Sequence, residues 1–172
     1  MSVSPPILCF VGRSGAGKTT LIVEVIRLLR DRGWRVVSVK HDVHGAQFDT
    51  EGKDSWRHKE AGAETVVLVA PGRVVSIGDA NGELTLEEVR DRFAQGVDLM
   101  LTEGFKRAPH PKIEVARAAV SESLLLGADE HLVAVATDFD PDVPVPKLDL
   151  NDTEAVTKFV EESILGAAGS RR

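Results

Sequence analysis

The sequence has a single cysteine, no excess of basic residues and no long apolar run. Cys9 lies in an apolar segment, so one chain can form neither a disulfide framework nor a cysteine-based metal site. Lys and Arg number 21 against 27 Asp and Glu, a net charge of -6, which argues against a broad surface for nucleic acid. No segment approaches the ~20 apolar residues of a membrane span, and the N-terminus lacks a signal-peptide pattern. We expect a buried thiol, a cytoplasmic location and small-molecule or protein partners, without nucleic acid or membrane.

The length and the apolar pattern predict one α/β domain over residues 1–172. A chain of 172 residues can bury one substantial core but is short for two independent domains. Apolar segments of strand length alternate with helix-like segments and lie at residues 7–11, 36–39, 66–70, 99–101 and 132–136. This alternation is typical of a three-layer sandwich with a mainly parallel sheet. We expect the tail, residues 166–172, to fray.

Helix starts and ends are marked at several places. Apolar residues recur at three- and four-residue spacing over residues 21–29, and Gly33 is placed to end that helix. Capping boxes at Thr85 to Glu88 and at Asn151 to Glu154 indicate two more helix starts. Between residues 65 and 79, two apolar segments flank a Pro-Gly turn, which predicts an antiparallel hairpin. Its free edge is a candidate surface for self-association.

Residues 12–19, Gly-Arg-Ser-Gly-Ala-Gly-Lys-Thr, match the complete P-loop pattern between a predicted strand and a predicted helix. Such a loop directs backbone N–H groups and a helix N-terminus at the β-phosphate of a nucleotide. Lys18 would reach the β- and γ-phosphates, Thr19 would bind Mg2+, and Arg13 is a candidate to meet phosphate in its own chain or in a dimer partner. The other expected nucleotide-binding residues are Gly12, Ser14, Gly15, Ala16, Gly17 and Thr20. A glycine-rich turn without phosphate is the weaker alternative.

Two acidic residues are candidates for the metal side of the site. Glu103 ends an apolar strand at its carboxyl end, where ligands gather in α/β sheets. It could contact Mg2+ through water, activate an attacking water, or be a solvated loop acid. Asp49 lies in the polar loop 40–55 and could contact Mg2+ or begin a turn. His41 and His44 of that loop could suggest a transition-metal pair, but no further ligands accompany them.

Further short motifs run in order from about residue 7 to residue 117. They are Val39-Lys-His41, Asp49 with Gly52-Lys-Asp-Ser55, Ala61-Gly-Ala63, Thr102-Glu-Gly-Phe-Lys106 and Pro111-Lys-Ile-Glu114. Together with the P-loop, this series resembles the MobB family of molybdopterin-guanine dinucleotide biosynthesis adaptor proteins. The combination is much more specific than a P-loop alone.

The resemblance implies a homodimeric GTP-binding adaptor with weak Mg2+-dependent GTPase activity. It implies association with the guanylyltransferase that converts molybdopterin cofactor and GTP to molybdopterin guanine dinucleotide. Asp49 and Glu103 would be acids on the magnesium side, and the candidates to face cofactor or phosphate are His41, Lys53, Asp54 and Lys106. Loop cations that could receive an anionic pterin phosphate, or else be separate solvated side chains, are Lys40, Lys53, Lys106, Arg107 and Lys112.

The choice of base and of reaction stays open at this point. The Asn-Lys-x-Asp element of many GTPases is absent, so GTP over ATP rests on the resemblance. Asp138 or Asp140 could accept hydrogen bonds from guanine, or form an ordinary turn after a strand. The alternative function is an ATP-dependent small-molecule kinase with Asp49 or Glu103 as base, against which stands the lack of an arginine-rich lid. A metal-insertion GTPase would need a His and Cys cluster that the sequence lacks.

Overall fold

The computed structural model describes residues 4–42, 45, 49–80, 82–127 and 129–166, which fall into two compact units. The larger unit contains the chain up to residue 41 and from residue 86 onward, and the smaller unit is residues 42–85. Within the described ranges, no helix has both the length and the apolar character that crossing a membrane requires. Residues 167–172 of the tail that we expected to fray lie outside the described residues.

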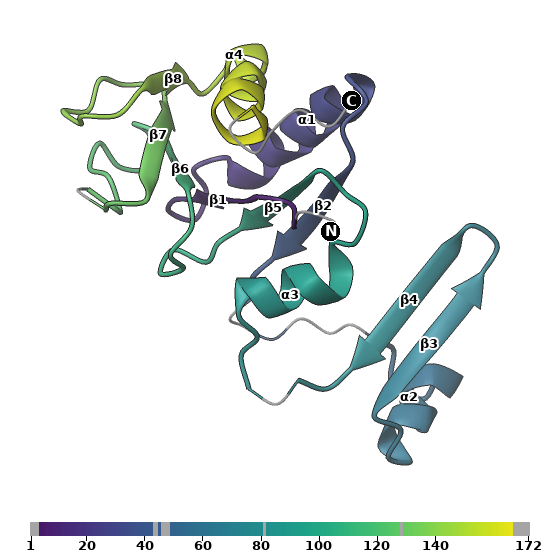
Figure 1. The fold of residues 1–172 in the computed structure, drawn as a ribbon. Coiled ribbons are helices and arrows are strands. Elements are labelled where there is room, and N and C mark those ends of the chain that lie inside the picture. The colour runs from purple at the N-terminus through teal and green to yellow at the C-terminus, as the bar shows by residue number, and fades with distance from the viewer. Residues whose placement is uncertain (1–3, 43–44, 46–48, 81, 128, 167–172) are drawn as a thin grey trace. The chain divides into compact units, whose positions relative to one another are not determined.

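The larger unit is built on a six-stranded parallel sheet with the order β2-β5-β1-β6-β7-β8 (Figure 1). Its strands are β1 (Ile7–Val11), β2 (Val36–Lys40), β5 (Leu99–Glu103), β6 (Lys112–Ala116), β7 (Leu132–Thr137) and β8 (Lys147–Asp149). Its helices are α1 (Lys18–Asp31), α3 (Leu86–Phe93) and α4 (Thr153–Val160), and a π-helical turn over Glu161–Leu165 continues α4. Because the strands are parallel, the loops that follow β1, β5, β6 and β7 meet at one edge of the sheet.

Alternate side chains of the central strand β1 enter two different cores. Leu8 and Phe10 are fully buried against the face covered by α1 and α4, whereas Cys9 lies in a second core with residues of α3. In Figure 1 these helices accordingly lie on opposite faces of the sheet. The structure therefore confirms the predicted α/β class, a three-layer P-loop-type sandwich with a mainly parallel sheet and a separate antiparallel hairpin.

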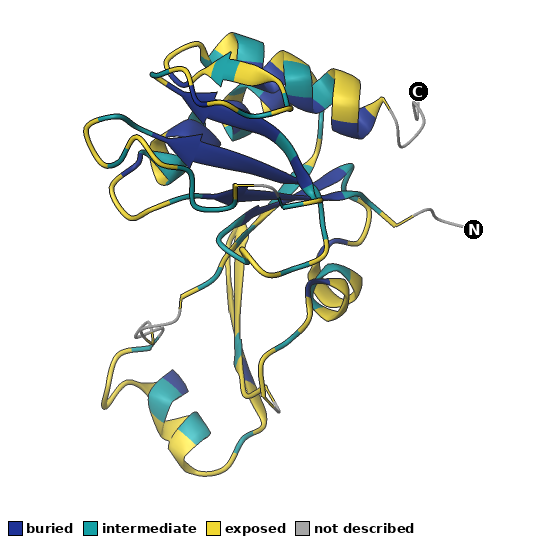
Figure 2. Cartoon of the chain, turned by 90° about the vertical axis from the view of Figure 1, so that its left-hand side faces the viewer, coloured by how far each residue is buried: buried dark blue, intermediate teal, exposed yellow. Residues whose placement is uncertain are grey.

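The smaller unit consists of α2 (Asp54–Glu60) and the hairpin β3 (Thr65–Ala70) and β4 (Arg73–Gly78). The two strands pair antiparallel from Thr65 opposite Gly78 to Ala70 opposite Arg73, which confirms the predicted hairpin. Lys59 of α2 donates hydrogen bonds to the Ala63 carbonyl oxygen at 2.8 Å and to a carboxylate oxygen of Asp79 at 2.6 Å. These bonds tie the helix to the base of a hairpin whose strands are mostly exposed (Figure 2).

Parts of the fold differ from the sequence prediction. The sequence pattern did not indicate β6, because the charged residues Lys112 and Glu114 interrupt its apolar character, although both are almost fully buried. Strand β8 and helix α2 are short and were not predicted either. The N-cap of α4 is Asp152 rather than Asn151, since an Asp152 carboxylate oxygen accepts the Ala155 backbone N–H at 2.9 Å.

Candidate functional site

The glycine-rich loop that follows β1 has a conformation that only glycine permits at two points. Gly12 has φ 146°, and a Cβ atom there would lie 2.2 Å from the Val115 carbonyl oxygen of β6. Gly17 has φ 95° and is the N-cap of α1. The loop backbone therefore lies against β6 and delivers the chain to the N-terminus of α1, whose first N–H groups have no partner within the helix.

Lys18 folds back onto this loop. Its Nζ atom donates hydrogen bonds to the carbonyl oxygens of Gly12 at 3.0 Å and Arg13 at 2.9 Å. The ammonium group is thereby held at the N-terminus of α1, where the helix dipole already favours negative charge. A fixed cation and a set of backbone N–H groups at one point form an environment suited to an anion.

The Thr19 hydroxyl and the Glu103 carboxylate meet beside the loop. Thr19 Oγ1 lies 2.9 Å from Glu103 Oε1 and 3.0 Å from Oε2, so the hydroxyl donates to the carboxylate. The β1–β5 pairing produces this contact, because Glu103 is in register with Phe10 near the end of β1. A hydroxyl and a carboxylate are both oxygen donors of the kind that Mg2+ takes together with phosphate and water. The donor set therefore fits the predicted ion, which Thr19 and Glu103 would hold directly or through its water.

An aromatic pair lies next to Glu103 at the same edge of the sheet. The rings of His41 and Phe105 are stacked, with centroids 4.6 Å apart and planes 20° from parallel. Phe105 has a φ of 56°, which turns the chain sharply after β5, and the His41 backbone N–H donates to the Glu103 carbonyl oxygen at 3.0 Å. The predicted site residue His41 is therefore beside Glu103, and a flat ring surface adjoins the acid.

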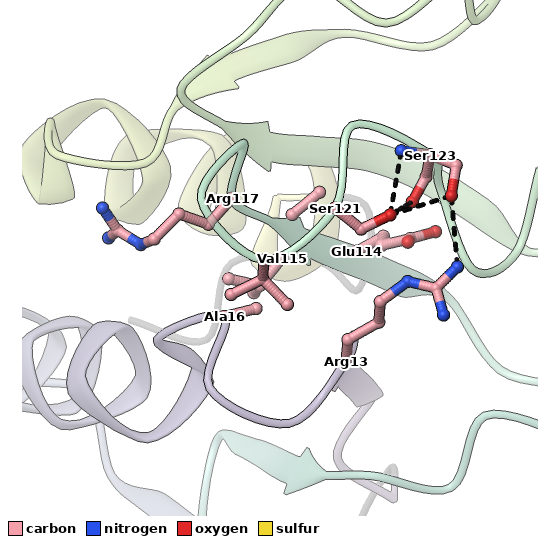
Figure 3. A pocket seen from close by; sticks show the side chains of 9 residues that line it. Arg13, Ala16, Glu114, Val115, Arg117, Ser121 and Ser123 are labelled. Carbon is pink, nitrogen blue, oxygen red and sulfur yellow. Dashed lines mark hydrogen bonds between the residues drawn. The ribbon is translucent and has the colours of Figure 1, made fainter.

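A shallow hollow that opens to solvent lies on the other side of the loop (Figure 3). Arg13 points into this region and donates from Nη2 to Ser123 Oγ at 3.2 Å. Beneath it, the buried Glu114 carboxylate accepts the backbone N–H groups of Leu125 and Leu126. Glu114 thus anchors the loop after β6, a role that the sequence motif Pro-Lys-Ile-Glu did not reveal.

Asp138 follows β7, and its carboxylate faces the end of β6. Its Oδ1 accepts the Ala118 backbone N–H at 2.7 Å, and its Oδ2 lies 3.5 Å from Nη1 of Arg117. Arg117 was not predicted as a site residue, because the sequence pattern did not indicate β6, the strand that it follows. Its place three residues after the Pro-Lys-Ile-Glu motif was the only signal for it. Asp140, the other predicted base acceptor, pairs instead with Lys147 and is largely exposed.

The remaining predicted residues lie at the surface or in the smaller unit. Ser14, Thr20 and Lys106 are exposed, while Ala16 is buried under the glycine-rich loop. In the smaller unit, Lys53 and Asp54 are exposed at the start of α2. Asp49 Oδ1 accepts the Ser55 hydroxyl at 2.9 Å, whereas its Oδ2 is buried without a hydrogen-bond partner. Asp49 therefore begins the turn into α2 and keeps one oxygen for a further donor or ion.

Lys112 was predicted to be one of the loop cations, and the structure shows that this prediction is wrong. It lies in β6 with 1 % of its side chain exposed, and its Nζ atom is 3.3 Å from Asp129 Oδ1.

On the same sheet, Cys9 is buried as predicted, and this burial raises the pKa of its thiol. His44 lies outside the described residues, and the described part of the chain contains no cluster of three metal-ligating side chains.

The sequence and the fold are both similar to those of a single protein family. The family model described as MobB, molybdopterin guanine dinucleotide synthesis protein B, matches residues 7–138. The molybdopterin-guanine dinucleotide biosynthesis adapter protein of Haemophilus influenzae is 37% identical over 96% of this chain and 93% of its own length. The protein of that name from Escherichia coli is 36% identical over 91% of this chain and 92% of its own. The crystal structure of Bacillus subtilis MobB superposes with a TM-score of 0.73 at 26% identity, covering 94% of this chain and 99% of that one.

Proposed function

Because the chain belongs to the MobB family, we propose that it is an adaptor in molybdopterin guanine dinucleotide biosynthesis that binds GTP with Mg2+ and assists a partner guanylyltransferase. The observation that carries the nucleotide part is the contact between Thr19 and Glu103 beside the P-loop lysine. Both residues present oxygen atoms next to a cation and a helix N-terminus. This arrangement suits a magnesium-bound nucleoside triphosphate.

Each P-loop residue has a defined task in this proposal. Backbone N–H groups from Gly15 to Thr20 and the Lys18 ammonium group bind the phosphates. Thr19 gives its hydroxyl oxygen to the ion, and Glu103 accepts hydrogen bonds from the ion's water shell. When bound, Mg2+ neutralises charge shared by the β- and γ-phosphates.

Hydrolysis is a slow, secondary activity in this proposal. Glu103 is the one described carboxylate in contact with the loop's Thr19, so it can also orient a water molecule near the γ-phosphate. Arg13 points to Ser123 and donates to its hydroxyl, so a role at the γ-phosphate would require the arginine to leave this contact. Because no arginine is assigned to the γ-phosphate among the described residues, weak turnover is expected.

The molybdopterin cofactor is proposed to bind near the carboxyl ends of β2 and β5. The stacked rings of His41 and Phe105 offer a flat surface suited to a pterin ring. Lys40 and Lys106 are exposed in the same unit and can attract its phosphate. From the sequence resemblance, Lys53 and Asp54 stay candidates to face cofactor or phosphate, and Asp49 stays a candidate for the metal.

Guanine selectivity is assigned to Asp138. A carboxylate has about four lone-pair sites, and the Ala118 N–H and Arg117 occupy only part of them. Asp138 follows β7 at the carboxyl edge of the sheet, where ligands of α/β folds bind, so its remaining acceptor capacity is available to the N1–H and N2–H groups of guanine. Adenine has no pair of adjacent donors like the N1–H and N2–H groups of guanine. Removing the Asp138 carboxylate should therefore reduce the preference for GTP over ATP.

Self-association is proposed to occur through the β3–β4 hairpin. Val69 is 79% exposed, and exposed apolar side chains occupy both faces of this two-stranded sheet: Val67, Leu68, Val74 and Val75. An isolated hairpin is only marginally stable in water, and a second copy of the chain would cover these side chains and pair with the free edge.

Sedimentation velocity should show a dimer that Val69→Asp converts to a monomer, with Val23→Asp at an exposed position of α1 as control. A dimeric, folded Val69→Asp protein would refute this interface.

The proposed function is tested by adding the chain to purified guanylyltransferase with GTP, Mg2+ and molybdopterin cofactor. We expect faster formation of the guanine dinucleotide with the wild type and loss of that effect with Lys18→Ala. Lys158→Ala, which changes an exposed lysine of α4, should behave as the wild type. Absence of both stimulation and complex formation would contradict the adaptor proposal, and ATP-dependent phosphorylation of a small molecule would replace it with a kinase.

A further inference from the structure

Arg117 is the described arginine that lies closest to the N-cap of α1. A Cβ atom added to Gly17 would be 3.5 Å from Arg117 Nη2 and 3.9 Å from its Nε. The arginine reaches this position from the first residue after β6, across the space between two strand ends (Figure 3). Its side chain is about one-third exposed, so the guanidinium is neither buried in the core nor free in solvent.

Asp138 lies beside the guanidinium and contacts one of its nitrogen atoms. Residues Ala116 and Thr137 are paired in the β6–β7 register, so Arg117 and Asp138 are the next residues on two adjacent strands. Asp138 Oδ2 faces Nη1 of Arg117, and Oδ1 is anchored by the Ala118 backbone N–H. The Nε and Nη2 atoms bond to no described residue. The arginine therefore presents a two-pronged donor edge at Gly17, the geometry that binds phosphate oxygens in a bidentate manner.

The side of the loop on which Arg117 lies determines which phosphate it meets. In the sheet order β5-β1-β6, Glu103 ends β5 and Arg117 follows β6, with the glycine-rich loop of β1 between them. Mg2+ held by Thr19 and Glu103 would lie on the β5 side of the loop, together with the β- and γ-phosphates whose charge it would neutralise. The β6 side would then be the side of the nucleoside and of the phosphate nearest to it.

We propose that Arg117 is a nucleotide-binding residue that contacts the nucleoside-proximal phosphates, and that Asp138 is its positioning residue. This inference rests on the proposed nucleotide binding but assigns a residue outside the P-loop motif. It makes a specific claim: the contact is common to GDP and GTP. An arginine that acted on the γ-phosphate would instead distinguish the two nucleotides.

The test uses Arg117→Gln, which removes the charge but keeps much of the length, and Arg117→Lys, which keeps the charge but not the fork. Arg35→Gln is the matched control, because Arg35 forms an ion pair of the same 3.5 Å length with Asp98 at the opposite, amino edge of the sheet. Calorimetric titrations with GDP and GTP in Mg2+ should show affinity lowered by roughly tenfold or more for Arg117→Gln, by the same factor for both nucleotides. Arg117→Lys should recover part of the loss, and Arg35→Gln should bind as the wild type.

The role of Asp138 is tested by a double-mutant cycle. Asp138→Asn should weaken binding in the wild-type background and have a smaller effect when Arg117 is already Gln, because only the proposed contact of Asp138 with guanine is then left to lose. Equal effects in both backgrounds would contradict the positioning role.

Two other outcomes distinguish failure of the Arg117 contact from failure of nucleotide binding itself. Wild-type affinity in a folded Arg117→Gln protein, or a loss confined to GTP, would overturn this inference while leaving the proposed function standing. A wild-type protein that binds neither GDP nor GTP would overturn the proposed function and this inference with it.

Discussion

Thr19 Oγ1 lies 2.9 and 3.0 Å from the two carboxylate oxygens of Glu103, although 84 residues separate them in the chain. The contact joins the first turn of α1 to the end of β5, and the parallel pairing of β1 with β5 sets its position. A hydroxyl and an acid brought together beside the glycine-rich loop form a preorganised oxygen pair suited to a hard cation.

Replacing Glu103 by Gln should reduce the part of GTP affinity that depends on Mg2+. The amide oxygen can still accept from Thr19, but the negative charge that orders the ion's water shell is lost. Loss of an outer-shell partner typically lowers metal affinity by about 10- to 100-fold. Titration of GTP at a series of Mg2+ concentrations measures the effect, and Glu24→Gln on α1 is the control for a neutralised exposed acid. Unchanged Mg2+ dependence in Glu103→Gln would show that Glu103 does not serve the ion.

Gly12→Ala should be much more destabilising than Gly33→Ala. Both glycines have positive φ, but a Cβ atom at Gly12 would lie 2.2 Å from the Val115 carbonyl oxygen, whereas nothing lies within 4 Å at Gly33. We expect about 1–2 kcal/mol for the backbone strain alone at Gly33 and a larger loss at Gly12. Urea unfolding gives both values, and equal losses would mean that the contact between the loop and β6 relaxes without cost.

Asp129→Asn should lower the free energy of unfolding at neutral pH. The pKa of Asp129 is held below its ordinary value because the His131 backbone N–H donates to its carboxylate, with Lys112 contributing as a cation. Since the folded-state pKa is the lower one, this stabilisation is complete above the unfolded-state pKa and is lost as the pH falls through the folded-state pKa.

The variant also leaves the buried Lys112 without an anionic partner, so we expect a loss of about 1–3 kcal/mol at pH 7. The difference from the wild type should begin to shrink as the pH falls below about 4, the ordinary pKa of the carboxyl group, and should be smallest below the lowered folded-state pKa, where the wild-type group is itself protonated. Asp142→Asn, at an exposed position, is the control. A difference that stayed constant between pH 7 and pH 3 would contradict the linkage.

Cys9 should resist thiol reagents in the native protein. Its side chain is fully buried in β1, and burial raises the pKa of the thiol, so the reactive thiolate is scarce near neutral pH. Reaction with a chromogenic disulfide should be slow in buffer and fast in urea. Rapid stoichiometric reaction of the folded protein would show that this face of the sheet opens readily.

The sequence was sufficient for the parts of the fold with simple patterns. The apolar segments of β1, β5 and β7, the spacing in α1 and the Pro-Gly turn of the hairpin all predicted the observed elements. Strand β6 was missed because Lys112 and Glu114 are charged, yet partners distant in the chain allow both to be buried. The same misreading placed Lys112 among the surface cations.

Contacts that depend on strand order could not be read from the chain. Arg117 and Asp138 become neighbours only because β6 and β7 are adjacent and in register. The approach of Arg117 to Gly17 requires in addition that β6 lie next to β1. The spacing of the P-loop motif predicted Lys18 and Thr19. Which residues lie around them depends on the order of the strands in the sheet.

Calorimetric titration with GTP and ATP, each with and without Mg2+, measures nucleotide binding at the P-loop directly. We expect Mg2+-dependent binding that favours GTP and is sharply weakened by Lys18→Ala in a protein that remains folded. Equal affinity of wild type and Lys18→Ala for GTP would contradict nucleotide binding at this loop.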